Sequence, residues 1–423
     1  MSSLPRLAVV VGNAVSDDSR VQRCAAAAAR GGWQVTVLGR SPNSDEHSIS
    51  GPGWTGRLLP LPPLDEENRQ LLRERDRLAG HRPWWWRHGG WRRLDPTISA
   101  LEVALAGPLE ALGPDVIHAN DRHTLPLAAR STALLRAAGR PTGWIADVHE
   151  DVLATADRGA RGLRGWARRR MIGGEESEWI GSADAVLTVS DILAQRLQER
   201  HGLRTRPTVV MNAPLEPDRD ADVAGLRTRI GLSREVPLLV YVGNCAPARG
   251  VSTVIDALPQ LPAAHLAVIA HPADPGADRL MEQAAQRGVA DRVHRIDFVP
   301  AEHVVALIRD ADIGLVPLLH RPNHEISLIT KYLEYLHAGI PVVCSDVRAM
   351  AEFTRTHDLG EVFAAGDTGG LVRAVESVLA DVVSYRRRVT QSGAVRATAW
   401  AVQEPTLLGV YERVLRQSAE QDV

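Results

Sequence analysis

Short apolar runs alternate with helical patterns along nearly the whole chain, and this alternation constrains the fold more than any other feature. The runs are continuous in Val, Ile and Leu, which is typical of strands buried on both faces. Such strands, separated by helices, predict parallel sheets with crossover helices and therefore an α/β fold. The predicted strands are 7–11, 34–38, 115–119, 144–148, 185–189, 208–212, 238–243, 266–270, 293–298, 313–318 and 341–345.

The length of the chain predicts two domains. Its 423 residues exceed the size at which one hydrophobic core usually stops growing, and 44% of them are hydrophobic, which is enough material for two cores. Segment 212–225 is polar, contains proline and offers few apolar anchors, so it is a candidate linker. We predict an N-terminal domain over residues 1–215 and a second domain over residues 216–399.

The composition argues against several classes of protein. A net charge of −2 lacks the basic excess of a nucleic-acid binder, so we expect no nucleic-acid partner. No apolar run approaches the ~20 residues of a membrane-spanning helix, and the first residues predict a strand rather than a signal peptide. Cys24, Cys245 and Cys344 lack metal-ligand spacing and are predicted to be buried thiols in a reducing cytoplasm. We therefore expect a cytoplasmic protein without a metal site.

Lys331 is the single lysine among 49 basic residues, and it lies in the segment that carries the most chemistry. Ser327 is predicted to cap a helix that presents Lys331 and, three residues later, Glu334 on one face. A helix N-terminus with an added ammonium suits a diphosphate, and a carboxylate one turn further suits the paired hydroxyls of a ribose. The alternative is an exposed Lys–Glu pair that contributes only a few tenths of a kcal/mol.

SLITKYLEYLHAGIPVV (327–343) resembles the donor-binding signature of family-4 (group 1) GT-B glycosyltransferases, in the subgroup that reads Lys-x-x-Glu-Tyr. Ile329 replaces the usual proline of that signature. Many members carry another glutamate eight residues before the position of Glu334, where this chain has Ile326. The resemblance implies that Lys331 contacts the diphosphate of a nucleotide sugar, that Glu334 contacts its ribose, and that Ser327 and Leu328 line the same site.

Two further blocks of the second half are similar to the same family. VYVGNCAPARG (240–250) implies a phosphate-binding loop, with Gly243, Arg249 and Gly250 on the donor side and Asn244 where many relatives carry a second arginine. IDFVPAEHVV (296–305) resembles the segment whose backbone receives the nucleobase. The residues expected to do so are Phe298, Val299 and Pro300. In the first half, Gly12 and Asn13 are also assigned to the donor side.

The first half contains blocks similar to the family as well, at 18–38, 115–130, 144–152 and 182–197. Residues 400–415 resemble the terminal helix that returns to the first domain, and we place this helix at 400–418. Polar residues at the carboxyl ends of parallel strands line the ligand crevice of such sheets, although some of them only hold loops. The acceptor-side candidates from these blocks are Arg20, His118, Asp121, Asp147 and Glu150, while His149 is a candidate for the donor sugar.

Four tryptophans fall within residues 84–91, where the alternation of strands and helices is interrupted. Trp84, Trp85 and Trp86 are candidates for an aromatic wall at the acceptor, and such a wall could hold a cationic acceptor by cation–π contact. The alternative is that these bulky side chains pack an irregular loop.

The resemblance implies a GT-B fold, in which two Rossmann-like domains with parallel sheets face an interdomain cleft. It implies a retaining glycosyltransferase that uses a UDP- or GDP-sugar and needs no metal or other cofactor, with Lys331, Arg249 and His149 as catalytic candidates. The acceptor is open and includes a small metabolite or natural-product precursor, and a homodimer is possible. The alternatives are a nucleotide-sugar epimerase of the same fold and a non-catalytic sugar-nucleotide-binding subunit.

Overall fold

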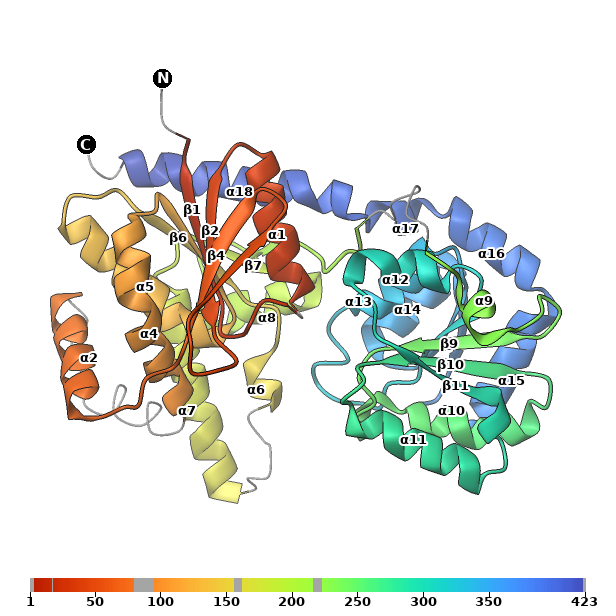
Figure 1. The fold of residues 1–423 in the computed structure, drawn as a ribbon. Helices are drawn as coiled ribbons and strands as arrows, with labels where there is room; N and C mark the ends of the chain where they lie inside the picture. The colour runs from red at the N-terminus through yellow and green to blue at the C-terminus, as the bar shows by residue number, and fades with distance from the viewer. Residues whose placement is uncertain (1–3, 17, 80–94, 156–161, 216–222, 421–423) are drawn as a thin grey trace. The chain divides into compact units, whose positions relative to one another are not determined.

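The computed structural model describes residues 4–16, 18–79, 95–155, 162–215 and 223–420. The chain divides into two compact units, and each is described here by itself. Unit 1 comprises Met1–Val210 together with Glu404–Val423, and unit 2 comprises Met211–Gln403. Each unit is built on one sheet that is flanked by helices (Figure 1). This arrangement confirms the predicted α/β fold class.

Among the described residues, eight strands form the sheet of unit 1, in the order β3-β4-β2-β1-β5-β6-β7-β8. All neighbours pair in parallel except β3 and β4, which form an antiparallel hairpin at one edge. The strands are β1 (Arg6–Val10), β2 (Gln34–Arg40), β3 (His47–Gly51), β4 (Trp54–Leu59), β5 (Val116–Asn120), β6 (Gly143–Asp147), β7 (Ala185–Thr188) and β8 (Thr208–Val209).

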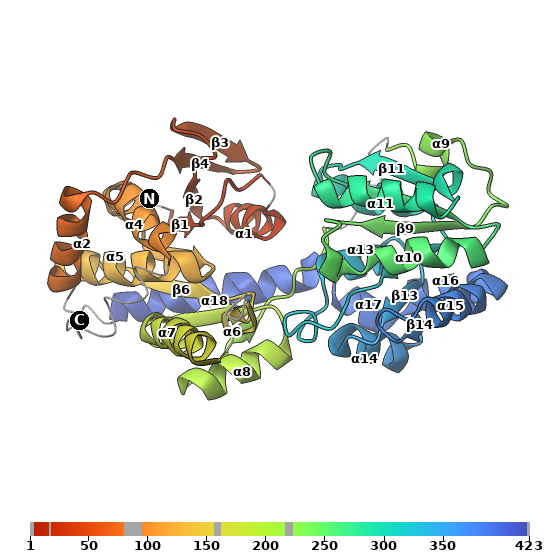
Figure 2. The ribbon, with the colours of Figure 1, turned by 90° about the horizontal axis from the view of Figure 1, so that it is seen from below.

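The helices of unit 1 begin and end where local chemistry favours it. Asp18 accepts a hydrogen bond from the Val21 N–H at the start of α1, and Asp65 and Ser190 cap α2 and α8 in the same way. Helices α4 and α5 pack side by side (Figures 1 and 2). The helices are α1 (Ser19–Arg30), α2 (Glu66–Leu78), α4 (Pro96–Leu112), α5 (Leu125–Ala137), α6 (Val152–Thr155), α7 (Gly162–Ile180), α8 (Asp191–His201) and α18 (Trp400–Glu420).

Helix α18 starts in unit 2 and continues into unit 1, where it packs on the sheet and on α1. Glu404 forms an ion pair with Arg30 of α1 at 2.6 Å. About two turns further along the helix, the Tyr411 ring lies edge-on to the Trp33 ring, with the ring centroids 5.7 Å apart. Helix α18 thereby contributes to the core of unit 1.

The sheet of unit 2 has the order β11-β10-β9-β12-β13-β14 among the described residues, and all its neighbours are parallel. Successive residues of the central strand belong to different hydrophobic clusters: Leu239 and Tyr241 to one, Leu238 and Val240 to the other. The sheet is therefore covered on both faces, as its continuous apolar strands predict. The strands are β9 (Leu238–Val242), β10 (His265–Ala270), β11 (Val293–Asp297), β12 (Ile313–Val316), β13 (Val342–Ser345) and β14 (Gly360–Phe363).

The helices of unit 2 follow their strands in the expected alternation (Figure 2). They are α9 (Leu226–Ile230), α10 (Val251–Ala257), α11 (Pro275–Gln286), α12 (Ala301–Ile308), α13 (Thr330–His337), α14 (Arg348–His357), α15 (Thr368–Ala380), α16 (Val382–Gln391) and α17 (Gly393–Ala397).

Three strands were not among the predicted ones: β3, β4 and β14. The sequence of β3, HSISG, is polar and partly exposed because it forms an edge of the sheet. Strand β14, GEVF, has only four residues, so neither offers the long apolar run that marks the central strands. The hairpin of β3 and β4 also makes the first sheet mixed rather than wholly parallel.

Candidate functional site

The carboxyl end of strand β9 is the point where the chain of unit 2 changes direction along its sheet. Strands β10 and β11 lie on one side of β9, and β12, β13 and β14 lie on the other. Ligands of open α/β sheets bind at the carboxyl ends of the strands at such a switch point. Gly243 follows β9 directly, and helix α13 follows β12 along the chain. The segment that resembles the donor-binding signature therefore lies near this switch point of the sheet.

Lys331 and Glu334 form a close ion pair on α13. Nζ of Lys331 lies 3.1 Å from Oε2 of Glu334, whose side chain is only 2% exposed. The Lys331 side chain is 22% exposed, and its ammonium lies 5.5 Å from the centroid of the Phe298 ring. A Cβ added to Gly243 would lie 4.0 Å from Cγ of Lys331. The pair is therefore mostly buried and adjoins two other predicted donor-side residues, unlike an exposed surface pair.

The start of α13 differs from the prediction. The helix begins at Thr330 after an extended Ile329, and no side chain caps it, so the predicted cap at Ser327 is wrong. Ser327 and Leu328 instead lie, half-buried, in the segment that leads into the helix. Because no side chain accepts the first N–H groups of α13, they remain suited to an anion beside Lys331.

The loop after β9 is ordered by hydrogen bonds around Asn244. The Tyr241 hydroxyl donates to the Asn244 carbonyl oxygen at 2.5 Å. Oδ1 of Asn244 accepts from Nε of Arg249 at 3.3 Å and from the Ala246 N–H at 3.3 Å. Asn244 thus orients the half-buried Arg249, while the Nη groups of the guanidinium make no hydrogen bond that involves Asn244. This asparagine has a positioning role that the sequence did not reveal.

Gly250 closes this loop with a positive φ of 71°, and a Cβ at this position would lie 1.8 Å from the Pro317 carbonyl oxygen. Gly250→Ala is therefore expected to lower the free energy of unfolding by more than ~2 kcal/mol. Gly231 is a matched control because its φ is 68° and a Cβ there meets nothing within 4 Å. Gly231→Ala should cost only the ~1–2 kcal/mol of the left-handed backbone. Equal losses in thermal unfolding would contradict the contact.

The segment before α13 contains Ile326, at the position where many family members carry a glutamate. Ile326 is 1% exposed and belongs to the hydrophobic core of unit 2. Glu325 points elsewhere: it pairs with Nδ1 of His320 at 2.7 Å and accepts from the Arg348 N–H at 2.7 Å.

The segment after β11 contains the three residues that are predicted to receive the nucleobase. Phe298 is 40% exposed, Val299 is 9% exposed, and the exposed Pro300 precedes α12. The Phe298 N–H donates to the Ala270 carbonyl oxygen, which continues the pairing of β10 and β11. The sheet therefore holds the backbone of Phe298, whose ring centroid lies 5.5 Å from Nζ of Lys331.

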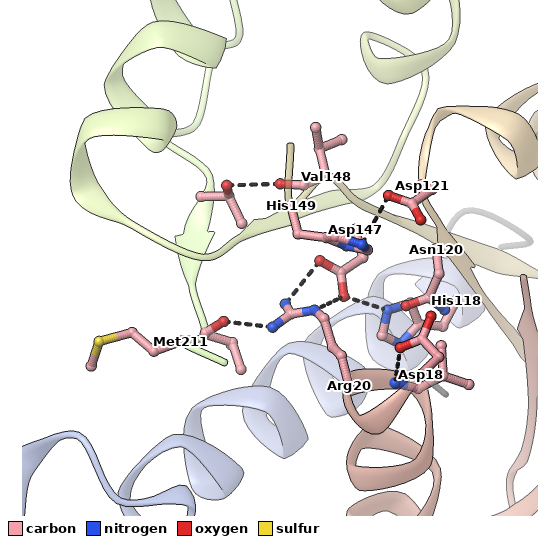
Figure 3. Close-up of polar contacts among 12 residues, drawn as sticks. Asp18, Arg20, His118, Asn120, Asp121, Asp147, Val148, His149 and Met211 are labelled. Atoms are coloured by element: carbon pink, nitrogen blue, oxygen red, sulfur yellow. Dashed lines mark hydrogen bonds and ion pairs between the residues drawn. The ribbon is translucent and has the colours of Figure 1, made fainter. Parts of the chain in front are cut away.

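A buried polar network lies at the carboxyl end of the sheet of unit 1 (Figure 3). Arg20 donates to both carboxylate oxygens of Asp147, at 2.7 and 2.8 Å, and to the Val210 carbonyl oxygen at 2.8 Å. His118 contacts Asp147 at 3.1 Å through Nε2 and the Tyr411 hydroxyl at 2.7 Å through Nδ1. Arg20, His118 and Asp147 are at most 3% exposed. These hydrogen bonds join β5, β6, α1, α18 and the residue that follows β8.

The charges of this network determine its protonation. Burial alone would raise the pKa of Asp147, but the charge of Arg20 and the hydrogen bond from His118 outweigh it and hold that pKa well below its usual range. Burial also raises the pKa of Cys24 to about 12, despite the nearby Arg20. The network therefore contains an ionised Arg–Asp pair beside a neutral thiol.

His149 and Asp121 form a second pair in unit 1, with Nε2 of His149 2.9 Å from Oδ1 of Asp121 (Figure 3). Burial lowers the pKa of His149, but the charge and hydrogen bond of Asp121 outweigh it and raise the pKa to about 9. Asp121 has φ 65° and ψ 158°, a region that costs a residue other than glycine about 1–3 kcal/mol. The structure thus brings together one predicted acceptor-side residue, Asp121, and one predicted donor-side residue, His149.

The remaining candidates of unit 1 are placed as follows. Gly12 adjoins His123, since a Cβ there would lie 3.4 Å from Cβ of His123. Asn13 donates to Asp18 at 2.8 Å and shapes the loop after β1. Glu150 is exposed. Trp84, Trp85 and Trp86 lie outside the described residues.

Comparison with known sequence families assigns both halves of the chain. The family described as Glycosyltransferase Family 4 matches residues 19–219, and the family described as Glycosyl transferases group 1 matches residues 236–381. The chain belongs to the group 1 glycosyltransferases. The resemblance of its sequence blocks to this group is thereby confirmed.

Relatives of this glycosyltransferase have several activities. It is 26% identical over 302 residues to "Glycogen synthase" of Mycobacterium tuberculosis, covering 69% of this chain and 66% of the relative. It is 26% identical over 369 residues to "D-inositol 3-phosphate glycosyltransferase" of Geodermatophilus obscurus, covering 77% of this chain and 78% of the relative. The chain thus spans about two thirds of the length of the glycogen synthase.

Solved structures of similar fold include a sucrose-phosphate synthase and the protein HepE. Sucrose-phosphate synthase of Thermosynechococcus elongatus matches with a TM-score of 0.70 at 19% identity, over 98% of this chain and 100% of that chain. HepE of Anabaena, in complex with UDP and glucose, matches with a TM-score of 0.67 at 14% identity, over 97% of this chain and 100% of that chain. These likenesses support the GT-B fold.

The part of the chain that the structure describes contains neither a helix suited to cross a membrane nor a cluster of potential metal ligands. In the described ranges, no helix is both long and apolar enough to cross a membrane. In the same part of the chain, no three His, Cys, Asp or Glu side chains gather as metal ligands would.

Proposed function

We propose that this protein is a retaining glycosyltransferase that moves a sugar from a nucleotide diphosphate to a hydroxylated acceptor. The observation that carries the proposal is the Lys331–Glu334 pair at the start of α13, beside Phe298 and the loop of Gly243. It combines an ammonium for the diphosphate, a carboxylate for the ribose and an aromatic ring at the same strand ends.

UDP is the first donor nucleotide to test. The structural neighbour HepE was solved with UDP and with UDP-glucose, and its fold matches nearly the whole of this chain. Arg249, oriented by Asn244 in the loop after β9, would add a second cation to the diphosphate. These two cations and the dipole of α13 support a donor site that needs no metal.

In the proposed reaction the bond between the anomeric carbon and the diphosphate oxygen breaks, and the acceptor oxygen forms its bond on the same face. The acceptor proton passes to the departing diphosphate oxygen. Negative charge therefore develops on the diphosphate, where Lys331 and Arg249 stabilise it.

The experiment that tests the function starts with nucleotide binding, measured as thermal shifts with UDP, GDP, ADP and dTDP. The matching nucleotide sugar is then incubated with hydroxylated acceptors such as inositol phosphates and sugar phosphates, which the names of the relatives suggest. NMR of the product is expected to show the anomer of the donor. An inverted anomer, or no binding of any of the nucleotides, would contradict the proposal.

Glu334→Gln is expected to weaken UDP binding by ~10-fold, because a charge-assisted hydrogen bond to the ribose is lost. The wild type should bind UDP more tightly than 2′-deoxy-UDP, and the variant should lose most of this preference. Calorimetry of both nucleotides with both proteins gives the coupling free energy between the Glu334 carboxylate and the 2′-hydroxyl of the nucleotide. Because Glu334 also neutralises Lys331, only the change in preference, and not the loss of affinity alone, supports the ribose contact.

A further inference from the structure

The loop after β12 is joined to the loop after β9 by main-chain contacts within unit 2. The Leu319 N–H donates to the Ala248 carbonyl oxygen at 3.0 Å. A Cβ at Gly250 would lie 1.8 Å from the Pro317 carbonyl oxygen, so the two loops approach each other closely. Ala248 directly precedes Arg249, the second cation proposed for the diphosphate. Because β9 and β12 are neighbours in the sheet, both loops lie at the carboxyl ends of adjacent strands.

The ring of His324 is anchored to this pair of loops. Its Nδ1 lies 2.7 Å from the Leu319 carbonyl oxygen, and the His324 N–H donates to the Arg321 carbonyl oxygen at 2.8 Å. A carbonyl oxygen can only accept, so Nδ1 carries a proton. In the neutral ring Nε2 is then unprotonated and presents a lone pair. Nε2 is therefore the ring nitrogen that this anchoring contact leaves for a ligand.

The charged groups that act on His324 come from both loops. Burial lowers the pKa of His324 below its usual value, although the main-chain hydrogen bond of its ring raises it. Arg249 is the charged group with the largest effect and also lowers this pKa, whereas Glu325 raises it and Arg321 lowers it slightly. Glu325 is already paired with His320 at 2.7 Å, so its charge is partly compensated. His324 is therefore neutral near pH ~7 in the free protein, in the field of a cation.

We propose that His324 is a further diphosphate-binding residue of the donor site, whose Nε2 takes up a proton from solvent when the diphosphate binds and then donates to one of its oxygens. The proposal rests on the proposed function, because it needs a diphosphate beside Arg249. The negative charges of the diphosphate compensate the charge of Arg249 and favour the imidazolium. The site then has a third cation, with Lys331 and Arg249, where charge develops on the departing group.

The first measurement needs no ligand. His324 is identified among the 15 histidines by the signal missing from His324→Asn, and its Cε1–H resonance is followed by NMR against pH. Its pKa should be lower than that of an ordinary histidine in the wild type and should rise in Arg249→Gln, because the opposing charge is removed. Arg373→Gln removes the same charge at a side chain that is 74% exposed, and it should leave the titration unchanged. A titration that does not move in Arg249→Gln overturns the proposal.

Proton uptake is the second measurement, with UDP-glucose as the probe. A terminal phosphate titrates near pH ~6, and UDP-glucose has none, so protons exchanged on binding belong to the protein. Calorimetry at pH ~7 in buffers of different ionisation enthalpy should show uptake of up to about one proton per bound ligand. His324→Asn can still donate to Leu319 but lacks Nε2, so it should take up none. His320→Gln is the matched control, because both ring nitrogens of His320 already contact carboxylates, Glu325 at 2.7 Å and Asp346 at 3.0 Å.

The pH dependence of affinity separates a ligand contact from a structural role. The imidazolium of the complex is present below its pKa and is lost as the pH rises through it, so wild-type affinity should fall at least ~10-fold between pH ~6 and ~8.5. His324→Asn should bind more weakly at pH ~6 and approach the wild type at pH ~8.5. His324→Gln places a neutral amide near the position of Nε2, so it should recover part of the affinity without proton uptake.

The outcomes distinguish this role from the proposed function. UDP-glucose binding without proton uptake in the wild type, or with equal uptake in His324→Asn, overturns the role of His324 and leaves the donor site intact. Absence of UDP-glucose binding in the wild type contradicts the proposed donor, and the diphosphate contact of His324 with it. Uptake that is lost in His324→Asn and retained in His320→Gln supports the proposal.

Discussion

Lys331→Ala is expected to weaken UDP binding at least ~10-fold and to lower kcat/KM for transfer by ~100-fold. The binding loss follows from a charge-assisted contact that contributes ~1.5–3 kcal/mol. The loss in kcat/KM is larger because charge on the diphosphate grows as the sugar departs, so the ammonium stabilises the transition state more than the bound donor. Calorimetry with UDP and initial rates with the nucleotide sugar measure the two effects.

The control for Lys331 must separate a lost contact from a lost charge. Arg373→Ala removes one positive charge from unit 2 at a side chain that is 74% exposed and pairs with Asp367 at 3.7 Å. Its effect on UDP affinity should be small, because exposed charges are screened. Unchanged UDP binding in Lys331→Ala, with a folded protein, would remove the donor site from α13.

Lys331→Arg tests why a chain that otherwise uses arginine keeps one lysine here. The ammonium lies 3.1 Å from Glu334 and 5.5 Å from the centroid of the Phe298 ring, so a wider guanidinium would have to displace one of them. We expect intermediate UDP affinity, since the charge stays but the compact geometry is lost. Full activity would mean that the lysine carries no geometric requirement.

The sequence predicted the central strands because these are long and continuous in Val, Ile and Leu. It missed β3, β4 and β14, because these strands are stabilised by pairing with neighbouring strands and lack a long apolar run of their own. The predicted cap at Ser327 was wrong because the chain stays extended through Ile329 before α13 begins. Local patterns thus identify strands buried on both faces better than edges and helix ends.

The candidate residues could be predicted individually, but their contacts could not. Polar residues after parallel strands pointed to Asp121, Asp147 and His149, yet nothing in the sequence pairs Arg20 with Asp147, which lies 127 positions away. Tyr411 was missed because its partner His118 is brought to it only by the packing of α18. The positive φ of Asp121 could not be predicted either, because glycine and not aspartate is the residue that usually indicates such a conformation.

Asp147→Ala is expected to lower the free energy of unfolding by ~3–5 kcal/mol, because it leaves the Arg20 guanidinium buried without its carboxylate. Arg20 is 3% exposed and Asp147 is fully buried, so solvent cannot replace the lost partner. Chemical denaturation followed by intrinsic fluorescence measures the loss. The double variant Arg20→Met with Asp147→Leu should recover much of it, because apolar side chains of similar size remove both charges together. A double variant less stable than Asp147→Ala would contradict this account.

The same pair predicts how stability depends on acid. The folded-state pKa of Asp147 lies well below its usual range because the opposing charge of Arg20 and the His118 hydrogen bond outweigh burial. Its carboxylate therefore contributes stability that is fully present above the unfolded pKa of ~3.9 and is lost as the pH falls toward the folded pKa. Asp147→Asn cannot be protonated in this way, so its unfolding free energy should fall less steeply below pH ~4 than that of the wild type. An equally steep acid limb in the variant would assign the acid sensitivity to another carboxylate, and the buried pair would then contribute little to it.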